Sequence, residues 1–235
     1  MNYIWRYSNR SMPVSVALSL FSYLLPIVVF LILLKKIKSW QLWVIFLYSF
    51  YSFSNDSVIL YRDSKGLYIN HFLYIFTVLE YLLLATYFWS IIQTKRLKTT
   101  LIVLTVLFAS FCIFNILTKP YKSFDSVQTS IEAILLIAYC IVYLFEEVNK
   151  PQITFIYSSF HFWIVIAILI YFSATFFLFV YANSLPLETA QDYWIISHFS
   201  NILKNIFFAT AFIIYAKKPS KPNKQHPTEY QPFLN

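Results

Sequence analysis

Four ionisable side chains interrupt otherwise apolar stretches of the chain and are its strongest candidates for chemistry: Asp56, Glu80, Glu132 and Lys204. A charged group at the centre of a membrane helix costs about 2.5 to 3.5 kcal/mol, so such residues usually face the protein interior and have partners there. Here three carboxyl groups share one lysine, and Lys204 can be the counter-ion of Asp56, Glu80 or Glu132. The two remaining acids would be protonated, hydrogen-bonded or matched by a bound cation.

Each of these residues has polar neighbours on its own helical face, at about 100° per residue. The four stripes are Ser49, Ser52, Asn55 and Asp56; Thr77, Glu80, Leu84 and Tyr87; Gln128, Glu132, Tyr139 and Tyr143; and Ser197, His198, Asn201, Lys204 and Asn205. A rise of about 1.5 Å per residue places the ionisable groups at the centre or in the outer half of a membrane. We therefore predict one outward-facing pocket for a small molecule or cation, formed by Asp56, Glu80, Glu132, His198, Asn201, Lys204 and Asn205. The alternative is that these groups only bond helices together.

No metal site or cofactor can be assigned from the sequence, and no catalytic residue is identified. The four histidines are scattered without HxxxH or HExxH spacing, and His71 lies on the opposite side of its helix from Glu80. Cys112 and Cys140 lie in separate apolar stretches and form no CxxC pair. The single glycine, Gly66, excludes glycine-rich nucleotide-binding loops.

The elements that must position these residues are long apolar stretches. The chain of 235 residues is 59% hydrophobic and 12% charged, whereas a soluble domain carries about 25% charged residues. Seven stretches are near the length needed to cross a bilayer as helices: 14–34, 40–61, 69–93, 99–117, 125–145, 158–181 and 193–216. This pattern predicts an all-α, polytopic membrane helix bundle of about seven transmembrane helices.

The distribution of basic residues predicts the orientation of this bundle. Eleven Lys and Arg residues fall in loops one, three and five and the C-terminal tail, against six on the other side, which favours N-out and C-in. The net charge of +8 therefore reflects topology, and no nucleic-acid partner is expected. Residues 1–216 are the expected transmembrane domain, and 217–235 a basic, Pro-rich, disordered cytoplasmic tail.

Four stretches also look familiar when read together: 73–84 (LYIFTVLEYLLL), 124–136 (FDSVQTSIEAILL), 162–177 (FWIVIAILIYFSATFF) and 194–212 (WIISHFSNILKNIFFATAF). They resemble an uncharacterised family of bacterial seven-helix integral membrane proteins, which implies the same architecture and an inner-membrane location. The resemblance carries over the positions Glu80, Glu132, 171–173 (YFS), Asn201 and Asn205. The family has no known activity, so the resemblance implies no substrate.

Three functions remain open. The favoured one is non-enzymatic: a receptor, sensor or accessory module in the lipid bilayer that binds a small molecule or cation and acts on a cytoplasmic or membrane signalling partner. The second is an intramembrane enzyme in which a carboxylate acts as general acid on a lipid or isoprenoid. The third is a proton- or cation-coupled transporter, less favoured because Pro26 is the only Pro or Gly within the seven stretches.

Overall fold

The computed structural model describes residues 14–67, 70–118, 126–150, 156–181 and 187–217, and this part of the chain is helical and contains no strand. Short 3₁₀ turns at Leu34–Lys36 and Ile156–Ser158 flank two of the helices. The α-helices are α1 (Val14–Ser22), α2 (Leu24–Leu33), α3 (Trp40–Ser64), α4 (Asn70–Ile91), α5 (Lys95–Thr118), α6 (Ser126–Val148), α7 (Phe160–Tyr181) and α8 (Leu187–Lys217). Since α1 and α2 follow one another within a single apolar stretch, the bundle has seven helical segments. The all-α prediction is confirmed for the described residues. Of the predicted tail, 217–235, Lys217 is the last residue of α8, and 218–235 lie outside the described residues.

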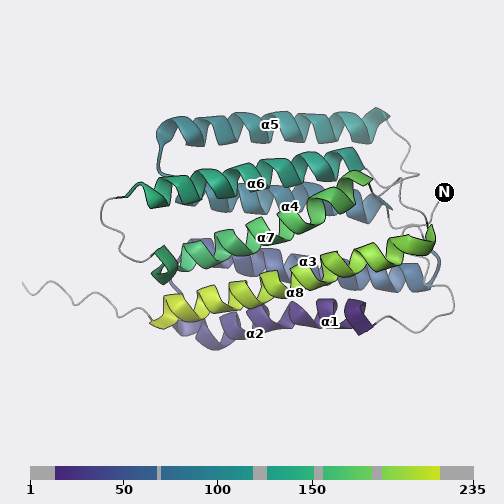
Figure 1. Ribbon diagram of the computed structural model, residues 1–235, viewed down its shortest axis with the longest axis horizontal. Helices are drawn as coiled ribbons and strands as arrows, with labels where there is room; N and C mark the ends of the chain where they lie inside the picture. Colours follow the sequence, from purple (N-terminus) through teal and green to yellow (C-terminus); the bar gives the residue numbers. More distant parts are fainter. Residues whose placement is uncertain (1–13, 68–69, 119–125, 151–155, 182–186, 218–235) are drawn as a thin grey trace, which may run out of the picture.

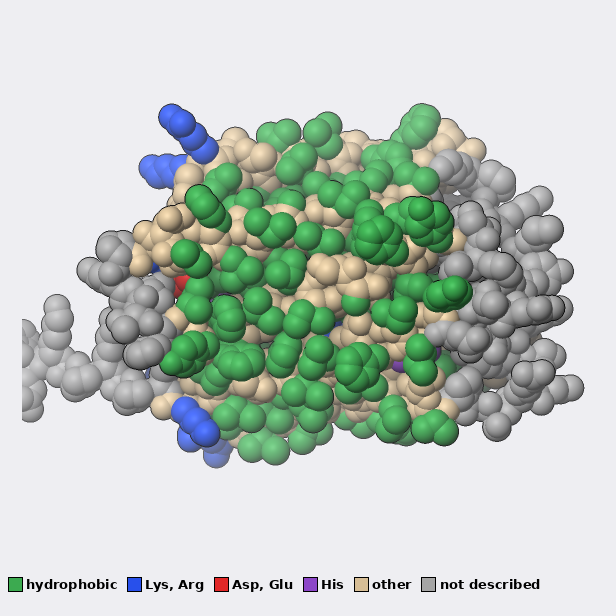
Figure 2. All heavy atoms as spheres, in the orientation of Figure 1, with side chains coloured by type: hydrophobic (Ala, Val, Ile, Leu, Met, Phe, Trp, Pro, Cys, Tyr) green, Lys and Arg blue, Asp and Glu red, His purple; other side chains and the backbone are tan. Residues whose placement is uncertain are grey.

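Five helical segments are long and apolar enough to cross a membrane: Val14–Lys36, Phe72–Ile91, Lys95–Thr118, Phe160–Tyr181 and Tyr193–Lys217. Large hydrophobic side chains on them face outward, such as Ile32, Leu107 and Phe177. Figure 2 shows such side chains covering the middle of one face, with Lys and Arg projecting toward one end. An apolar surface of this kind suits contact with lipid, and together with the five candidate spans it indicates that the chain is a membrane protein.

The helices run side by side along the long axis of the molecule (Figure 1). α7 packs between α6 and α8, α8 packs against α1 and α2, and α3 packs against α4. α5 lies at one edge of the bundle, next to α4. The buried centre is rich in aromatic side chains, including Phe30, Tyr48, Phe88, Phe172 and Phe208. Figure 1 places the start of α1 and the start of α8 at the same end of the bundle.

The first apolar stretch is not one continuous helix, because it breaks at Tyr23. Pro26 has no backbone N–H and cannot bond the carbonyl of Ser22 four residues earlier. At the break itself, the Tyr23 N–H bonds the carbonyl of Leu20 at 3.3 Å, only three residues earlier, which is a tighter turn than that of an α-helix. The backbone of Tyr23 stays near helical values, with φ −63° and ψ −26°. The break is therefore local, and α2 continues in much the same direction as α1 (Figure 1).

The last helix begins earlier than predicted, at Leu187 instead of position 193. Its first residues are polar, and the prediction rested on where the apolar sequence begins. α8 is consequently 31 residues long and is the longest helix of the described chain.

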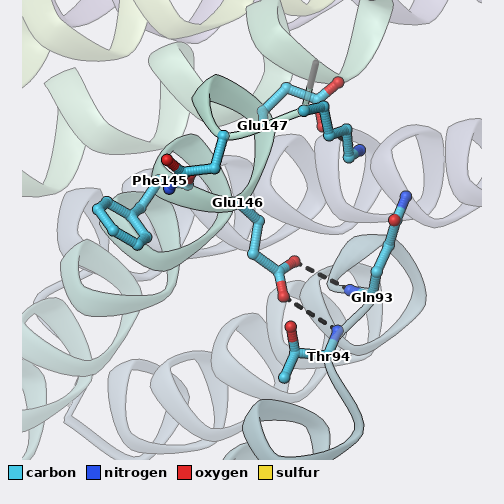
Figure 3. Close-up of polar contacts among 7 residues, drawn as sticks. Gln93, Thr94, Phe145, Glu146 and Glu147 are labelled. Carbon is cyan, nitrogen blue, oxygen red and sulfur yellow. Dashed lines mark hydrogen bonds and ion pairs between the residues drawn. The ribbon is translucent and has the colours of Figure 1, made fainter. Parts of the chain in front are cut away.

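α5 also begins earlier than predicted, at Lys95, and a side chain from α6 holds the segment that leads into it. The carboxylate of Glu146 accepts hydrogen bonds from the backbone N–H groups of Gln93 at 2.9 Å and Thr94 at 3.0 Å (Figure 3). Partial burial raises the pKa of Glu146, but hydrogen bonds from Thr94 and Gln93 and the charge of Lys150 outweigh it, so the pKa is lowered. Glu146 thus satisfies backbone groups that a helix start leaves without partners.

Candidate functional site

A cavity of about 160 Å³ lies inside the bundle, near the end where α1 begins and α3 ends. Residues of α1, α3, α4, α6, α7 and α8 line it, together with Tyr23 at the break between α1 and α2. Among the predicted pocket residues, four line this cavity: Asp56, Glu80, His198 and Asn201. The polar stripes of three helices, α3, α4 and α8, therefore meet at one place, because each faces the interior of the bundle.

Glu80 and Lys204 are joined through a tyrosine between them. The hydroxyl of Tyr48 donates a hydrogen bond to the Glu80 carboxylate at 2.7 Å. The same hydroxyl accepts one from the Lys204 ammonium at 2.8 Å. All three side chains are buried, with Glu80 5% and Lys204 1% exposed. The arrangement is a hydrogen-bonded chain across α4, α3 and α8, in which the lysine reaches its acid through Tyr48.

The Lys204 ammonium also lies against three tyrosine rings. Its nitrogen is 4.0 Å from the ring centre of Tyr171, 4.9 Å from that of Tyr48 and 5.5 Å from that of Tyr23. The negative face of an aromatic ring attracts a cation at these distances. Tyr23 and Tyr171 also line the cavity, so these two rings separate the lysine from the cavity.

Asp56 is the second acid at the cavity. Asp56 and Tyr23 both line the cavity and interact electrostatically. Both Asp56 and Glu80 interact electrostatically with Lys204, so the lysine is shared between them. Asp63, two turns further along α3 than Asp56, lines the same cavity.

Two asparagines of α8 hold α1 in place. The Asn201 side chain donates to the hydroxyl of Ser19 at 2.9 Å, and the Asn205 side chain donates to that of Ser22 at 2.7 Å. The Ser22 hydroxyl in turn bonds the carbonyl of Ser19 at 2.6 Å. These bonds join α8 to the last turn of α1, directly before the break at Tyr23. For Asn205, helix packing accounts for the polar side chain, and Asn201 combines this role with a place on the cavity wall.

Glu132 of α6 lies apart from the other acids. It is 1% exposed, and within the described part of the chain neither of its carboxylate oxygens has a hydrogen-bond partner. It does not line the cavity, although Thr129, one turn earlier, does. It interacts electrostatically with Glu80. His198, by contrast, is partly exposed and lies on the cavity wall.

The sequence prediction missed the tyrosines that connect the site. Tyr48 lies four and eight residues before Ser52 and Asp56, so helical spacing already placed it on the polar stripe of α3. With 19 tyrosines in the chain, composition does not distinguish Tyr48 from the aromatic residues usual in membrane helices. Tyr23 had a weaker signal, namely Pro26 three residues later. Tyr171 gave no signal beyond its place in the segment 171–173 (YFS), which the family resemblance carries over.

The arrangement can hold a positive charge beside two carboxylates, and it can pass a proton along Glu80, Tyr48 and Lys204. Across the described residues, no three His, Cys, Asp or Glu side chains gather as a metal site requires. Comparison with known proteins found no matching family model, no similar curated protein and no similar solved structure. The function must therefore be inferred from the geometry of the cavity.

Proposed function

We propose that this protein is a receptor, sensor or accessory module of the bacterial inner membrane that binds a small molecule in the cavity between its helices. In this proposal the chain crosses the membrane seven times, with its N-terminus outside, and the cavity opens outward. The observation that carries it is the cavity of about 160 Å³ with Asp56 and Glu80 on its wall. An engineered cavity of about 150 Å³ holds benzene, so the ligand is about the size of one ring.

The chain from Glu80 to Lys204 gives the ligand a route to the rest of the protein. A ligand that interacts with Glu80 changes the hydrogen bond between Glu80 and Tyr48, and with it the position of Lys204 on α8. α8 continues from the cavity to Lys217, at the opposite end of the bundle. A partner protein that contacts this end, in the cytoplasm or in the membrane, would sense the change. The difference in ligand affinity between the two arrangements sets the strength of such coupling.

The proposal is tested by identifying what copurifies with the full chain. The protein is purified in mild detergent and examined by native mass spectrometry, and bound compounds are extracted and identified. Glu80→Gln is compared with Glu146→Gln, which makes the same chemical change at the opposite end of the bundle. A compound retained by the native protein and Glu146→Gln but lost from Glu80→Gln supports the proposal. A native protein with no bound compound and no stabilisation by any member of a library of ring-sized molecules would contradict it.

The broken first helix favours a transporter as the second candidate. Transporters often place the ends of discontinuous helices at their substrate site, and Tyr23, at the break between α1 and α2, lines the cavity. The discriminating experiment is uptake by proteoliposomes under a pH gradient. Accumulation that depends on Glu80 identifies a transporter, whereas binding without accumulation identifies a receptor.

A further inference from the structure

The charges on the cavity wall determine the kind of ligand that the proposed binding function would involve. Asp56, Asp63 and Glu80 line the cavity, and none of its described lining residues is a Lys or Arg. The one nearby lysine, Lys204, is not on the wall and already binds the Tyr48 hydroxyl. A ligand in the cavity therefore faces carboxyl groups without a lysine or arginine side chain among them. This favours a cation and disfavours an anion.

The rest of the wall is aromatic. Tyr23, Phe76, Tyr171, Phe179 and Trp194 line the cavity. Trp194 and Phe179 are each 8% exposed, and their ring centres are 6.5 Å apart. Rings of this kind attract ammonium groups, most strongly when water is excluded. Carboxylates and aromatic rings together are the usual surroundings of an alkylammonium ligand.

The protein already binds an ammonium group next to this wall. Tyr23 and Tyr171, which line the cavity, also lie against the ammonium group of Lys204 at 5.5 Å and 4.0 Å from their ring centres. Asp56 and Glu80 are the carboxylates that act on this ammonium. The surroundings of Lys204 thus show that the same side chains can stabilise an organic cation inside the bundle.

We propose that the cavity is a binding site for a small organic ammonium ion, with its charge between Asp56 and Glu80 and its alkyl groups against the aromatic rings. This inference rests on the proposed function, because it names the chemistry of the ligand for the same cavity. The volume of about 160 Å³ limits the ligand to roughly the size of benzene. Choline has the size and charge required, and it is a suitable probe for this class.

The test compares choline with 3,3-dimethylbutan-1-ol, which has the same shape but a carbon atom in place of the charged nitrogen. Binding to the full chain in lipid nanodiscs is measured by calorimetry and by thermal stabilisation, with butylammonium as a primary amine and sodium chloride as an ionic-strength control. We expect choline or butylammonium to bind at least tenfold more tightly than the neutral alcohol. Asp56→Asn should weaken ammonium binding at least tenfold and leave binding of the alcohol unchanged, while Glu146→Gln should change neither.

Equal affinity for choline and the neutral alcohol would overturn the inference but leave the proposed binding function standing. The same holds if neither ammonium ion binds while the extraction experiment recovers a neutral or anionic compound. The comparison of choline with the alcohol uses the native protein, so it remains decisive even if Asp56→Asn fails to fold. The proposed function itself would be contradicted by a different result, namely a cavity that neither retains nor binds any compound.

Discussion

Tyr48→Phe tests whether the hydrogen-bonded chain between Glu80 and Lys204 stabilises the bundle. The substitution removes one hydroxyl and keeps the ring, which is fully buried. Two hydrogen bonds are lost, at 2.7 Å to Glu80 and at 2.8 Å from Lys204. A hydrogen bond to a charged group contributes about 1.5 to 3 kcal/mol, whereas bonds between membrane helices average about 0.6 and reach at most about 1.7 kcal/mol. Taken for two bonds, both ranges include a value of about 3 kcal/mol. We therefore expect Tyr48→Phe to lower the free energy of unfolding by that amount.

The free energy of unfolding is measured by reversible titration with sodium dodecyl sulfate in mixed micelles, followed by circular dichroism. Tyr171→Phe is the matched control, because it also removes one tyrosine hydroxyl but keeps the ring that lies 4.0 Å from the Lys204 ammonium. Its expected cost is below about 1 kcal/mol, since one neutral bond at most is lost.

A double-mutant cycle distinguishes the loss of the hydrogen bonds that join Glu80, Tyr48 and Lys204 from a loss of packing. In a Glu80→Gln, Lys204→Met background, Tyr48→Phe no longer leaves a charged group without its partner, and its cost should fall by about 2 kcal/mol. The reasoning is refuted if Tyr48→Phe is no more destabilising than Tyr171→Phe. It is also refuted if the cost of Tyr48→Phe is the same in both backgrounds.

Three further predictions concern the periphery of the site and the topology. Glu146→Gln should lower stability by about 1 kcal/mol in thermal unfolding. Because the folded-state pKa of Glu146 is lowered, its contribution is full above the unfolded-state pKa of about 4.3 and is lost as the pH falls through the folded-state value. The difference between Glu146→Gln and the native protein should therefore shrink on acidification, and a difference that grows would contradict the assignment. With the N-terminus outside, Ser64→Cys should react with a membrane-impermeant maleimide on intact cells, and Thr99→Cys only after the membrane is opened; the reverse pattern would invert the topology. Asn205→Leu should speed amide hydrogen exchange in α1 but not in α6, because its bond to Ser22 is lost, and equal exchange would show that this bond does not hold α1.

The sequence was sufficient to predict the helices, because an apolar stretch of bilayer length has few alternatives to a helix. It was less informative at helix ends. α5 starts at Lys95 because a carboxylate from α6 holds the preceding backbone, and that contact joins residues 52 and 53 positions apart. α8 starts at Leu187, in a polar segment for which the hydropathy pattern predicts a loop. A helix boundary set by a distant side chain, or placed in polar sequence, leaves no mark in the apolar pattern.

Which residues face inward was predictable, since helical spacing orients a whole stripe at once. Ser49, Ser52, Gln128, Lys204 and Asn205 are all 1% exposed or less. How the stripes pair was not predictable, because pairing depends on the rotation and height of each helix against its neighbours. The spacing brought Lys204 and Glu80 to similar depth but could not show that Tyr48 lies between them.

Helix packing explains some of the buried polar groups and leaves others unexplained, and this difference supports the site. The Asn205 side-chain N–H bonds the Ser22 hydroxyl between α8 and α1, so this pair stabilises the packing of the two helices. Asp56 faces the cavity and interacts with Lys204 of α8, but that ammonium is already linked through Tyr48 to Glu80. A carboxyl group at this depth costs free energy whether or not a ligand is present. One buried lysine requires one acid as its counter-ion, whereas a bound cation gives the second acid a partner as well.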